Sequence, residues 1–147
     1  MKKIPINRLL LISMILSLAL GACTQAKPET PSQGSSKIAN PASEYCVEQG
    51  GELSIQKRSD GGEYGVCIFE ENRQCEEWAM MRGDCPVGGV KITGYVTPAA
   101  VFCAITGGEY NVTGDSGSEK EQGTCTFKSG KTCDVWEYYE GSCTPDS

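Results

Sequence analysis

Four cysteines recur twice along this 147-residue chain with nearly the same spacing. The first separation is 21 residues in one set and 22 in the other, and both sets continue with separations of 8 and 10. The first set is Cys46, Cys67, Cys75 and Cys85, and the second is Cys103, Cys125, Cys133 and Cys143. An asparagine or threonine before a proline, a Gly-Gly-Glu triplet and a tryptophan also recur in register, which indicates an internal duplication. We therefore expect a repeat at 40–85, a connector at 86–96 and a second repeat at 97–143.

The expected fold class is α+β, built from two small disulfide-rich modules. A module of about 46 residues rarely buries enough apolar surface to fold without disulfides, a metal or a partner. Asn40 and Thr97 are good N-cap residues, each is followed by proline, and a glycine pair ends the helix predicted to follow. Apolar and polar residues then alternate around a glycine-rich turn, which predicts a β-hairpin in each repeat. A second short helix is expected after the hairpin, so each unit is predicted as helix, hairpin, helix.

The second helix of each repeat is predicted to bury a tryptophan. Counting in threes from Cys75 places Trp78 and Met81 on one face, and the same count in the second copy gives Trp136. A tryptophan between two cysteines can be an exposed binding platform, but in so small a domain it is more often part of the core. We therefore expect Trp78 and Trp136 to be the core aromatic residues of their modules.

The cysteines are expected to form structural disulfides. Structural zinc sites favour cysteine pairs two to four residues apart, usually with histidine, and this chain has no such pair and no histidine. Redox-active thiols need electropositive surroundings, whereas acidic residues follow Cys75 and Cys133. Each set of four allows three connectivities. A Cys75–Cys85 bond would require the chain to double back at Gly83, because an unbroken helix would hold its ends about 15 Å apart.

The N-terminal segment predicts an exported lipoprotein. Three basic residues precede the apolar run "LLLISMILSLAL" and the tripeptide "GAC", a pattern typical of a cleaved signal peptide over 1–22. The run is too short for a transmembrane helix. The quartet "LGAC" resembles the lipobox of bacterial lipoproteins, in which the cysteine becomes the lipidated N-terminus. Lipidation of Cys23 would leave eight cysteines to pair, whereas an ordinary secretory peptide would leave one spare thiol. Residues 23–39 are predicted to be a flexible tether.

Charge and composition restrict the possible functions. The precursor carries a net charge of −6, and removal of the basic leader takes the chain to about −9, which disfavours nucleic acid as a partner. Without histidine, the usual nucleophilic triads and most metallohydrolase sites are excluded. Glu52 and Glu109 are the remaining candidates for paired catalytic carboxylates, but glutamates at strand starts are far more often solvated. We expect neither enzymatic activity nor a cofactor or metal.

Two stretches resemble a known family. The motifs are Asn-Pro-Ala before Tyr-Cys, then Gly-Gly, then Glu-Trp, over Asn40 to Cys85 and, more divergently, over Thr97 to Cys143. This pattern resembles the bacterial family called domain of unknown function 333, whose members are commonly short lipoproteins and often carry a haemolysin label. The resemblance implies two disulfides per repeat, which would be Cys46–Cys67, Cys75–Cys85, Cys103–Cys125 and Cys133–Cys143. Thr97 replaces Asn40 and Val135 replaces Glu77, so a family role of those polar side chains would not extend to the second copy.

These observations favour a non-enzymatic interaction protein. We expect it to be anchored by lipid in the bacterial cell envelope, to face an oxidising compartment and to contact an envelope protein. An exported protease inhibitor is one alternative, because disulfides could hold a loop such as "SDGGEYG" rigid. A haemolysin, as the family label implies, is the other. After the leader, however, the sequence has no long apolar or amphipathic segment with which to build a pore.

Overall fold

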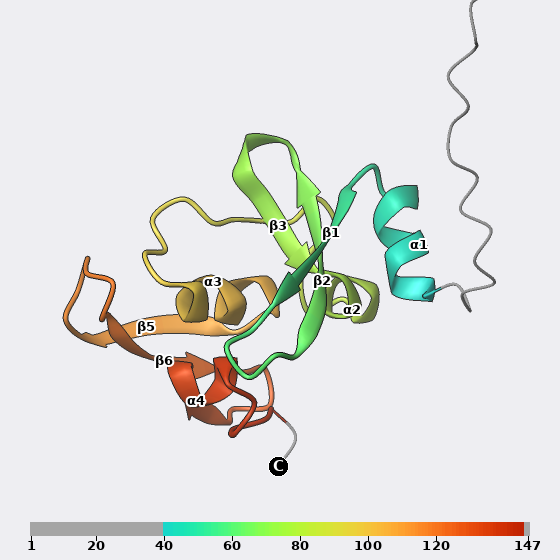
Figure 1. Cartoon of the computed structure of the whole chain (residues 1–147). Coiled ribbons are helices and arrows are strands. Elements are labelled where there is room, and N and C mark those ends of the chain that lie inside the picture. Colours follow the sequence, from blue (N-terminus) through green and yellow to red (C-terminus); the bar gives the residue numbers. More distant parts are fainter. Residues whose placement is uncertain (1–39, 146–147) are drawn as a thin grey trace, which may run out of the picture. The chain divides into compact units, whose positions relative to one another are not determined.

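A computed structural model describes residues 40–145 of the chain (Figure 1). The predicted leader, Cys23 and the tether lie outside the described residues. The first repeat contains α1 (Pro41–Glu48), β1 (Glu52–Lys57), β2 (Glu63–Phe69), a 3-10 turn (Glu70–Asn72), β3 (Arg73–Glu76) and α2 (Glu77–Arg82). The connector contributes β4 (Val90–Lys91). The second repeat contains α3 (Pro98–Ile105), β5 (Glu109–Gly114), β6 (Gln122–Thr126), β7 (Thr132–Asp134) and α4 (Val135–Tyr139).

Both opening helices begin as the sequence predicts. The Asn40 side chain accepts a hydrogen bond from the backbone N–H of Ala42, and the Thr97 side chain accepts one from Ala100. Proline follows each cap, where its fixed φ suits the first turn and its missing N–H costs nothing. Gly50 and Gly107, just beyond the helix ends, have φ of 81° and 87°, a region that glycine enters without steric cost.

Each repeat contains one strand more than the predicted hairpin. The strand order is β1-β2-β3-β4 in one sheet and β5-β6-β7 in the other, with antiparallel neighbours throughout. Cys75 therefore lies on a strand, opposite Cys67, and Cys133 lies opposite Cys125. The connector adds the edge strand β4, which pairs with β3. Each unit is a helix, an antiparallel sheet and a second helix.

The prediction that Trp78 is a core residue is wrong. Trp78 is 40% exposed and Met81 is 44% exposed, whereas Ala79 and Met80 are buried. The count in threes began at Cys75, but this cysteine belongs to β3, in which side chains alternate with a period of two. Because α2 begins only at Glu77, its buried face is shifted by one residue from the predicted one.

Trp136, at the equivalent position of the second repeat, is half-buried. It packs against the larger apolar cluster, and its indole N–H donates to the carbonyl oxygen of Glu121 at 3.1 Å. Its ring lies edge-on to Tyr139 at 6.2 Å. Trp136 is therefore half-buried against the core, and it is not one of the buried core residues.

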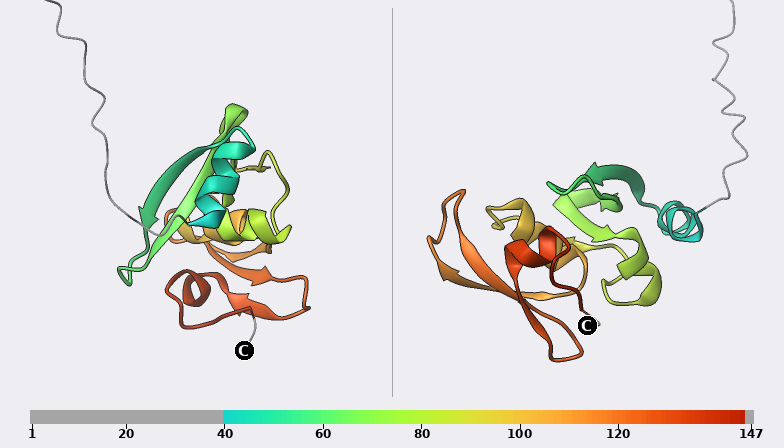
Figure 2. Two further views of the ribbon diagram at one scale, coloured as in Figure 1. Left: turned by 90° about the vertical axis from the view of Figure 1, so that its right-hand side faces the viewer. Right: turned by 60° about the horizontal axis from the view of Figure 1, so that its bottom comes forward.

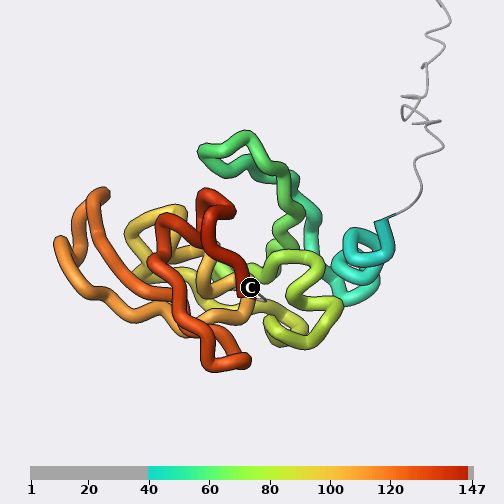
Figure 3. Tube along the Cα trace, turned by 90° about the horizontal axis from the view of Figure 1, so that it is seen from below, coloured from blue at the N-terminus to red at the C-terminus, as the bar shows by residue number. Residues whose placement is uncertain are grey.

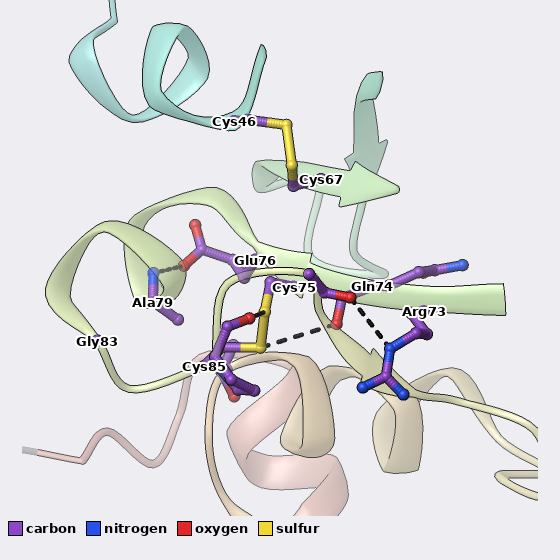
Figure 4. The surroundings of a disulfide bond; sticks show 12 residues. Cys46, Cys67, Arg73, Gln74, Cys75, Glu76, Ala79, Gly83 and Cys85 are labelled. Atoms are coloured by element: carbon purple, nitrogen blue, oxygen red, sulfur yellow. Dashed lines mark hydrogen bonds between the residues drawn. A yellow bond between two sulfur atoms is a disulfide. The ribbon is translucent and has the colours of Figure 1, made fainter. Parts of the chain in front are cut away.

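The structure has the four disulfides that the family resemblance implied. Figure 4 shows the two of the first repeat, Cys46–Cys67 and Cys75–Cys85. The Cys75–Cys85 bond joins Cα atoms 5.9 Å apart. Gly83, with φ of 79°, ends α2, and the N–H groups of Asp84 and Cys85 both donate to the carbonyl oxygen of Ala79. The chain therefore doubles back at Gly83, as the geometry of that bond requires.

Two adjacent glycines of the first repeat differ in what an added methyl group would meet. A Cβ on Gly51 would overlap the sulfur of Cys67, whereas a Cβ on Gly50 would meet open space but require a left-handed backbone. We expect Gly51→Ala to lower the free energy of unfolding by about 3 kcal/mol through overpacking. Gly50→Ala should cost only about 1 kcal/mol, through backbone strain alone. Urea denaturation of the oxidised proteins measures both, and equal losses would contradict this assignment.

The two repeats share an apolar core within one compact unit. Figure 2 shows the helices and strands of the two repeats side by side. Val66, on β2, is fully buried in the same cluster as Phe102 and Ile105 of α3. Tyr64, also on β2, lies edge-on to Phe102 with ring centroids 5.0 Å apart. One face of the first sheet therefore packs against the helices of the second repeat. The first repeat keeps a smaller cluster of its own around Met80 and its four cysteines.

The two surfaces that meet, one on β2 and one on α3, are apolar, whereas the equivalent surfaces of the other copy, on β6 and α1, are polar. On β2 the residues at the interface are Tyr64, Val66 and Ile68, and on β6 the matching residues are Gln122, Thr124 and Thr126. On α3, Val101 and Ile105 face the shared core, and on α1 the matching residues are Glu44 and Glu48. Terminal units of repeat proteins need polar outer faces to remain soluble. These replacements leave each repeat with a polar face where its counterpart has an apolar one.

Candidate functional site

A cleft of about 680 Å³ lies between the two repeats. Aromatic side chains from both repeats line it, and they are Tyr64, Phe102, Phe127 and Tyr138. Charged side chains also line it, and they are Arg58, Glu76, Arg82, Asp84 and Lys128. This volume is within the usual range for pockets that hold small ligands. Neither repeat alone supplies all the walls, so the duplication itself creates the cleft.

The aromatic rings form a connected cluster. Phe102 projects from α3, and its ring centroid lies 5.0 Å from that of Tyr64 and 5.0 Å from that of Tyr138 on α4. Phe127, which follows β6, lies edge-on to Tyr138 at 4.8 Å. Such contacts hold rings more firmly than area burial alone would. The cluster gives the cleft a rigid apolar lining.

Arg58 brings the first repeat's hairpin turn onto the second repeat. Its guanidinium carbon lies 5.8 Å from the centre of the Phe102 ring, and it forms an ion pair with Asp60 at 3.1 Å. Figure 3 shows this turn beside the C-terminal residues, and a Cβ on Gly141 would meet Asp60 at 3.3 Å. The loop "SDGGEYG", considered above as an inhibitory loop, thus begins in a tight turn directly after Arg58, whose side chain lies against Phe102 of the same protein. Inhibition of a protease remains a prediction.

A second link between the repeats also lines the cleft. The Lys128 ammonium donates to the carbonyl oxygen of Gly83 at 2.9 Å and lies 3.5 Å from the Asp84 carboxylate. The same carboxylate pairs with Arg82 at 3.1 Å. Both cationic side chains remain more than half exposed. One aspartate thus serves two cations.

Glu76 is the other acidic residue in the cleft. Its carboxylate caps α2 by accepting a hydrogen bond from the backbone N–H of Ala79 at 2.7 Å. Burial raises its pKa above the ordinary value, while the helix N–H groups partly oppose that shift. Because its oxygens already serve the helix, Glu76 is a structural carboxylate here.

The cleft concentrates positive charge in an acidic protein. Between residues 40 and 145 there are eight lysines and arginines and seventeen aspartates and glutamates. Three of the eight cations line this one cleft, against two acids. A clustered charge in a partly enclosed site creates a local potential that the net charge of the molecule does not reveal.

A buried carboxylate lies elsewhere in the first repeat. Glu77 is only 4% exposed and accepts hydrogen bonds from the Asn40 amide, at 2.7 Å, and from the Ser43 hydroxyl. A Cβ on Gly65 would overlap this carboxylate, so the glycine makes room for it. The network joins the N-terminus of α1 to α2.

The second repeat replaces this whole network with apolar or smaller groups. The residues that match Asn40, Ser43 and Glu77 are Thr97, Ala100 and Val135. All three partners change together, and both versions leave buried groups satisfied, as stable interiors require. The network is therefore one of two interchangeable structural solutions, and we assign it no ligand.

Tyr64, which lines the cleft, is a tyrosine whose pKa is raised. Burial, and secondarily the neighbouring Tyr139, raise its pKa from 10.0 to about 12. Because the folded state holds this proton more tightly than the unfolded chain, the resulting stability is present below pH 10 and is lost as pH rises to about 12. Tyr64→Phe should therefore flatten the alkaline decline in unfolding free energy and remove one late phenolate from an absorbance titration. An ordinary midpoint near 10 for Tyr64 would contradict this prediction.

The residues singled out from the sequence do not form a catalytic site. All eight cysteines between 40 and 145 are disulfide-bonded, and Glu52 and Glu109 are exposed at the starts of their strands in different sheets. Within the same range, no three His, Cys, Asp or Glu side chains are placed to hold a metal ion. Among the residues that the structure describes, no helix has the length and apolar character needed to cross a membrane.

Sequence reasoning missed the cleft and the Glu77 network. Arg58, Arg82 and Lys128 are far apart in sequence and belong to no motif. A signal was nevertheless present in the aligned copies, because positions that change from apolar to polar mark the surfaces that meet. Coordinated changes at Asn40 and Glu77 likewise mark a buried contact.

The fold and cleft define a class of protein: a tandem, disulfide-rich α+β module with a ligand-sized cleft between its copies. Comparison with known proteins then gives the family. The chain belongs to the family described as Domain of unknown function (DUF333), whose model matches residues 37–84 and 94–142. The four disulfides indicate an oxidising, extracytoplasmic location.

The curated relatives are shorter than this chain. Uncharacterized protein YoaF of Escherichia coli K12 is 36% identical over 81 residues, which are 53% of this chain and 95% of the relative. The YoaF proteins of another Escherichia coli strain and of Shigella flexneri match to the same extent. No solved structure was found to match the chain. The match thus takes up almost all of YoaF but only about half of this chain.

Proposed function

We propose that this protein is a non-enzymatic binding protein, held at a bacterial envelope membrane by a lipid on Cys23, and that its cleft between the repeats receives the partner. The observation that carries the proposal is the composition of the cleft. It combines a rigid aromatic lining with cations from both repeats, and it has the volume of a ligand pocket. A tether at 23–39 would let the two modules reach partners a short distance from the membrane.

The chemistry of the cleft favours binding over catalysis. The chain has no histidine, and the eight cysteines between residues 40 and 145 are all in disulfides. Glu76 is engaged with the N-terminus of α2, and Asp84 is engaged with two cations. None of these groups is arranged as a nucleophile beside a general base. What remains available is hydrogen-bond donors and apolar surface, which are the means of recognition.

Anchoring is tested by the chemistry of Cys23. We expect the wild-type protein to incorporate a fatty-acid label and to sediment with membranes, and its N-terminal peptide to carry the mass of a lipidated cysteine. Cys23→Ala should abolish both the label and the sedimentation, while the neighbouring substitution Thr24→Ala should leave them intact. A free thiol at Cys23 in the wild-type protein would refute lipid anchoring.

Partner binding is tested by comparative capture from the protein's own envelope. Three baits are compared, each the full lipidated chain. The first is the wild-type protein, and the second, the cleft bait, carries Arg82→Gln and Lys128→Gln. The third, the control bait, carries Lys57→Gln and Lys120→Gln, which lie outside the cleft. We expect the same partner with the wild-type and control baits, and its loss with the cleft bait. Equal recovery by all three baits would place binding outside the cleft, and no partner enriched on the wild-type bait would count against a binding function.

A further inference from the structure

We infer that the cleft recognises a short acidic peptide segment that carries an aromatic side chain beside its carboxylates. This inference rests on the proposed function and adds the chemical class of the ligand. It follows from three properties of the cleft: the placement of its cations, the edge-to-face packing of its rings and its size.

The cations approach the cleft from separate elements. Arg58 lies on the turn between β1 and β2, Arg82 ends α2, and Lys128 follows β6. Arg82 and Lys128 share the single carboxylate of Asp84, at 3.1 and 3.5 Å, and both remain more than half exposed. A carboxylate of a ligand can therefore accept hydrogen bonds from Arg82 or from Lys128. Because both cations are exposed, this leaves no buried charge without a partner. Such charge-assisted bonds are about twice as strong as neutral ones.

The rest of the protein sets the selectivity. An acidic ligand is repelled by the surface at large, where acids outnumber bases about two to one. Charges beyond about 8 Å are screened at physiological salt, so the local cations dominate once the ligand enters. The contrast directs an acidic segment into the cleft and away from other surfaces.

The aromatic lining favours a side chain over a sugar ring. Sugars stack on open aromatic faces, but the face of Phe102 is covered by Arg58. Tyr64 and Phe102 meet edge to face at 73°, and so do Phe127 and Tyr138. A pocket lined by edges and tilted rings suits an inserted aromatic side chain, because such rings prefer edge-to-face contacts. The volume of about 680 Å³ fits a few residues and excludes a folded domain.

Fluorescence anisotropy with the disulfide-intact protein and three end-blocked, labelled pentapeptides tests the ligand class. The acidic probe is Glu-Asp-Phe-Asp-Glu, its uncharged isostere is Gln-Asn-Phe-Asn-Gln, and its truncated form is Glu-Asp-Ala-Asp-Glu. We expect the acidic probe to bind at least about tenfold more tightly than either of the others. Its affinity should fall as salt is raised, because exposed charges are screened.

Matched variants localise the binding. Arg82→Gln with Lys128→Gln should weaken the acidic probe by about tenfold or more, and Lys57→Gln with Lys120→Gln should leave its affinity unchanged. These side chains are exposed, so the variants are expected to fold, and circular dichroism verifies this. Equal affinity for the acidic and uncharged probes would overturn the inference, and so would equal losses in the two variants.

Two further outcomes separate this inference from the proposed function. If none of the peptides binds while the envelope partner is still lost from the cleft bait, the ligand class is wrong and the binding function stands. If an anionic oligosaccharide such as oligogalacturonate binds more tightly than the acidic peptide, the peptide assignment is overturned in favour of a glycan.

Discussion

Replacing Glu77 with valine is expected to lower the free energy of unfolding by about 3 kcal/mol. The substitution removes the acceptor of two partly buried donors, the amide of Asn40 and the hydroxyl of Ser43. Each donor left buried without a partner costs about 1–3 kcal/mol, and breaking a buried charged network costs about 3–5 kcal/mol. Urea denaturation of the oxidised protein, monitored by circular dichroism, measures the loss.

The second repeat supplies the control for this prediction. The triple variant Asn40→Thr, Ser43→Ala, Glu77→Val places the residues of the second copy in the first. It removes both donors together with the acceptor, and replacing all partners by apolar groups of suitable shape is nearly neutral. We expect the triple variant to recover most of the stability lost in Glu77→Val. A triple variant no more stable than the single one would show that the two networks are not interchangeable.

Phe102→Ala is expected to lower the free energy of unfolding by about 4 kcal/mol, the usual range for a buried phenylalanine being about 3–5 kcal/mol. Phe102 is 6% exposed and joins both repeats through its contacts with Tyr64 and Arg58. Its removal leaves a cavity at the shared core, together with an arginine that has lost its aromatic partner. Urea denaturation of the oxidised protein again gives the loss.

The matched control is Tyr45→Ala, the same position in the first repeat. Tyr45 is only half-buried and packs on the smaller core of its own repeat. We expect the free energy of unfolding to fall by only about 1–2 kcal/mol, because the Tyr45 side chain buries less apolar area than that of Phe102. Equal losses in Phe102→Ala and Tyr45→Ala would contradict the asymmetry between the two repeats.

The elements that the sequence predicted well depend on local chemistry. Asn40 and Thr97 cap helices because their side chains satisfy N–H groups two or three residues away. Gly83 permits the Cys75–Cys85 bond because the chain reverses direction at this one residue, whose backbone is left-handed. Repetition of such local signals in two copies also made the α+β module and its disulfide framework predictable.

The features that the sequence did not predict depend on where each strand or helix begins, or on contacts between residues far apart in the chain. Strands β3 and β7 are only four and three residues long, too short for an alternating pattern to stand out. Treating Cys75 as helical shifted the predicted face of α2 and placed Trp78 in the core. The cleft needs Arg58, Arg82 and Lys128 together, and only the packing of one repeat on the other makes them neighbours.

The differences between the copies are as informative as their similarities. Ile68 and Thr126 occupy equivalent positions, yet only the first lies at the interface between the repeats. Lys128 likewise replaces Glu70, which provides the cation that reaches Asp84 across the cleft. Divergence after duplication thus produced one joined face, two polar ends and a cleft that is absent from a single module.

Photo-crosslinking from the cleft in the living cell envelope tests the central claim most directly. A photoreactive amino acid at Ser129, which lines the cleft, is compared with one at Ser118, another exposed serine, in the β5–β6 loop. The account predicts a discrete adduct from Ser129 that disappears when Arg82→Gln and Lys128→Gln are added, and no such adduct from Ser118. The same adduct from both positions, or an adduct from Ser129 that survives the loss of both cations, would contradict it.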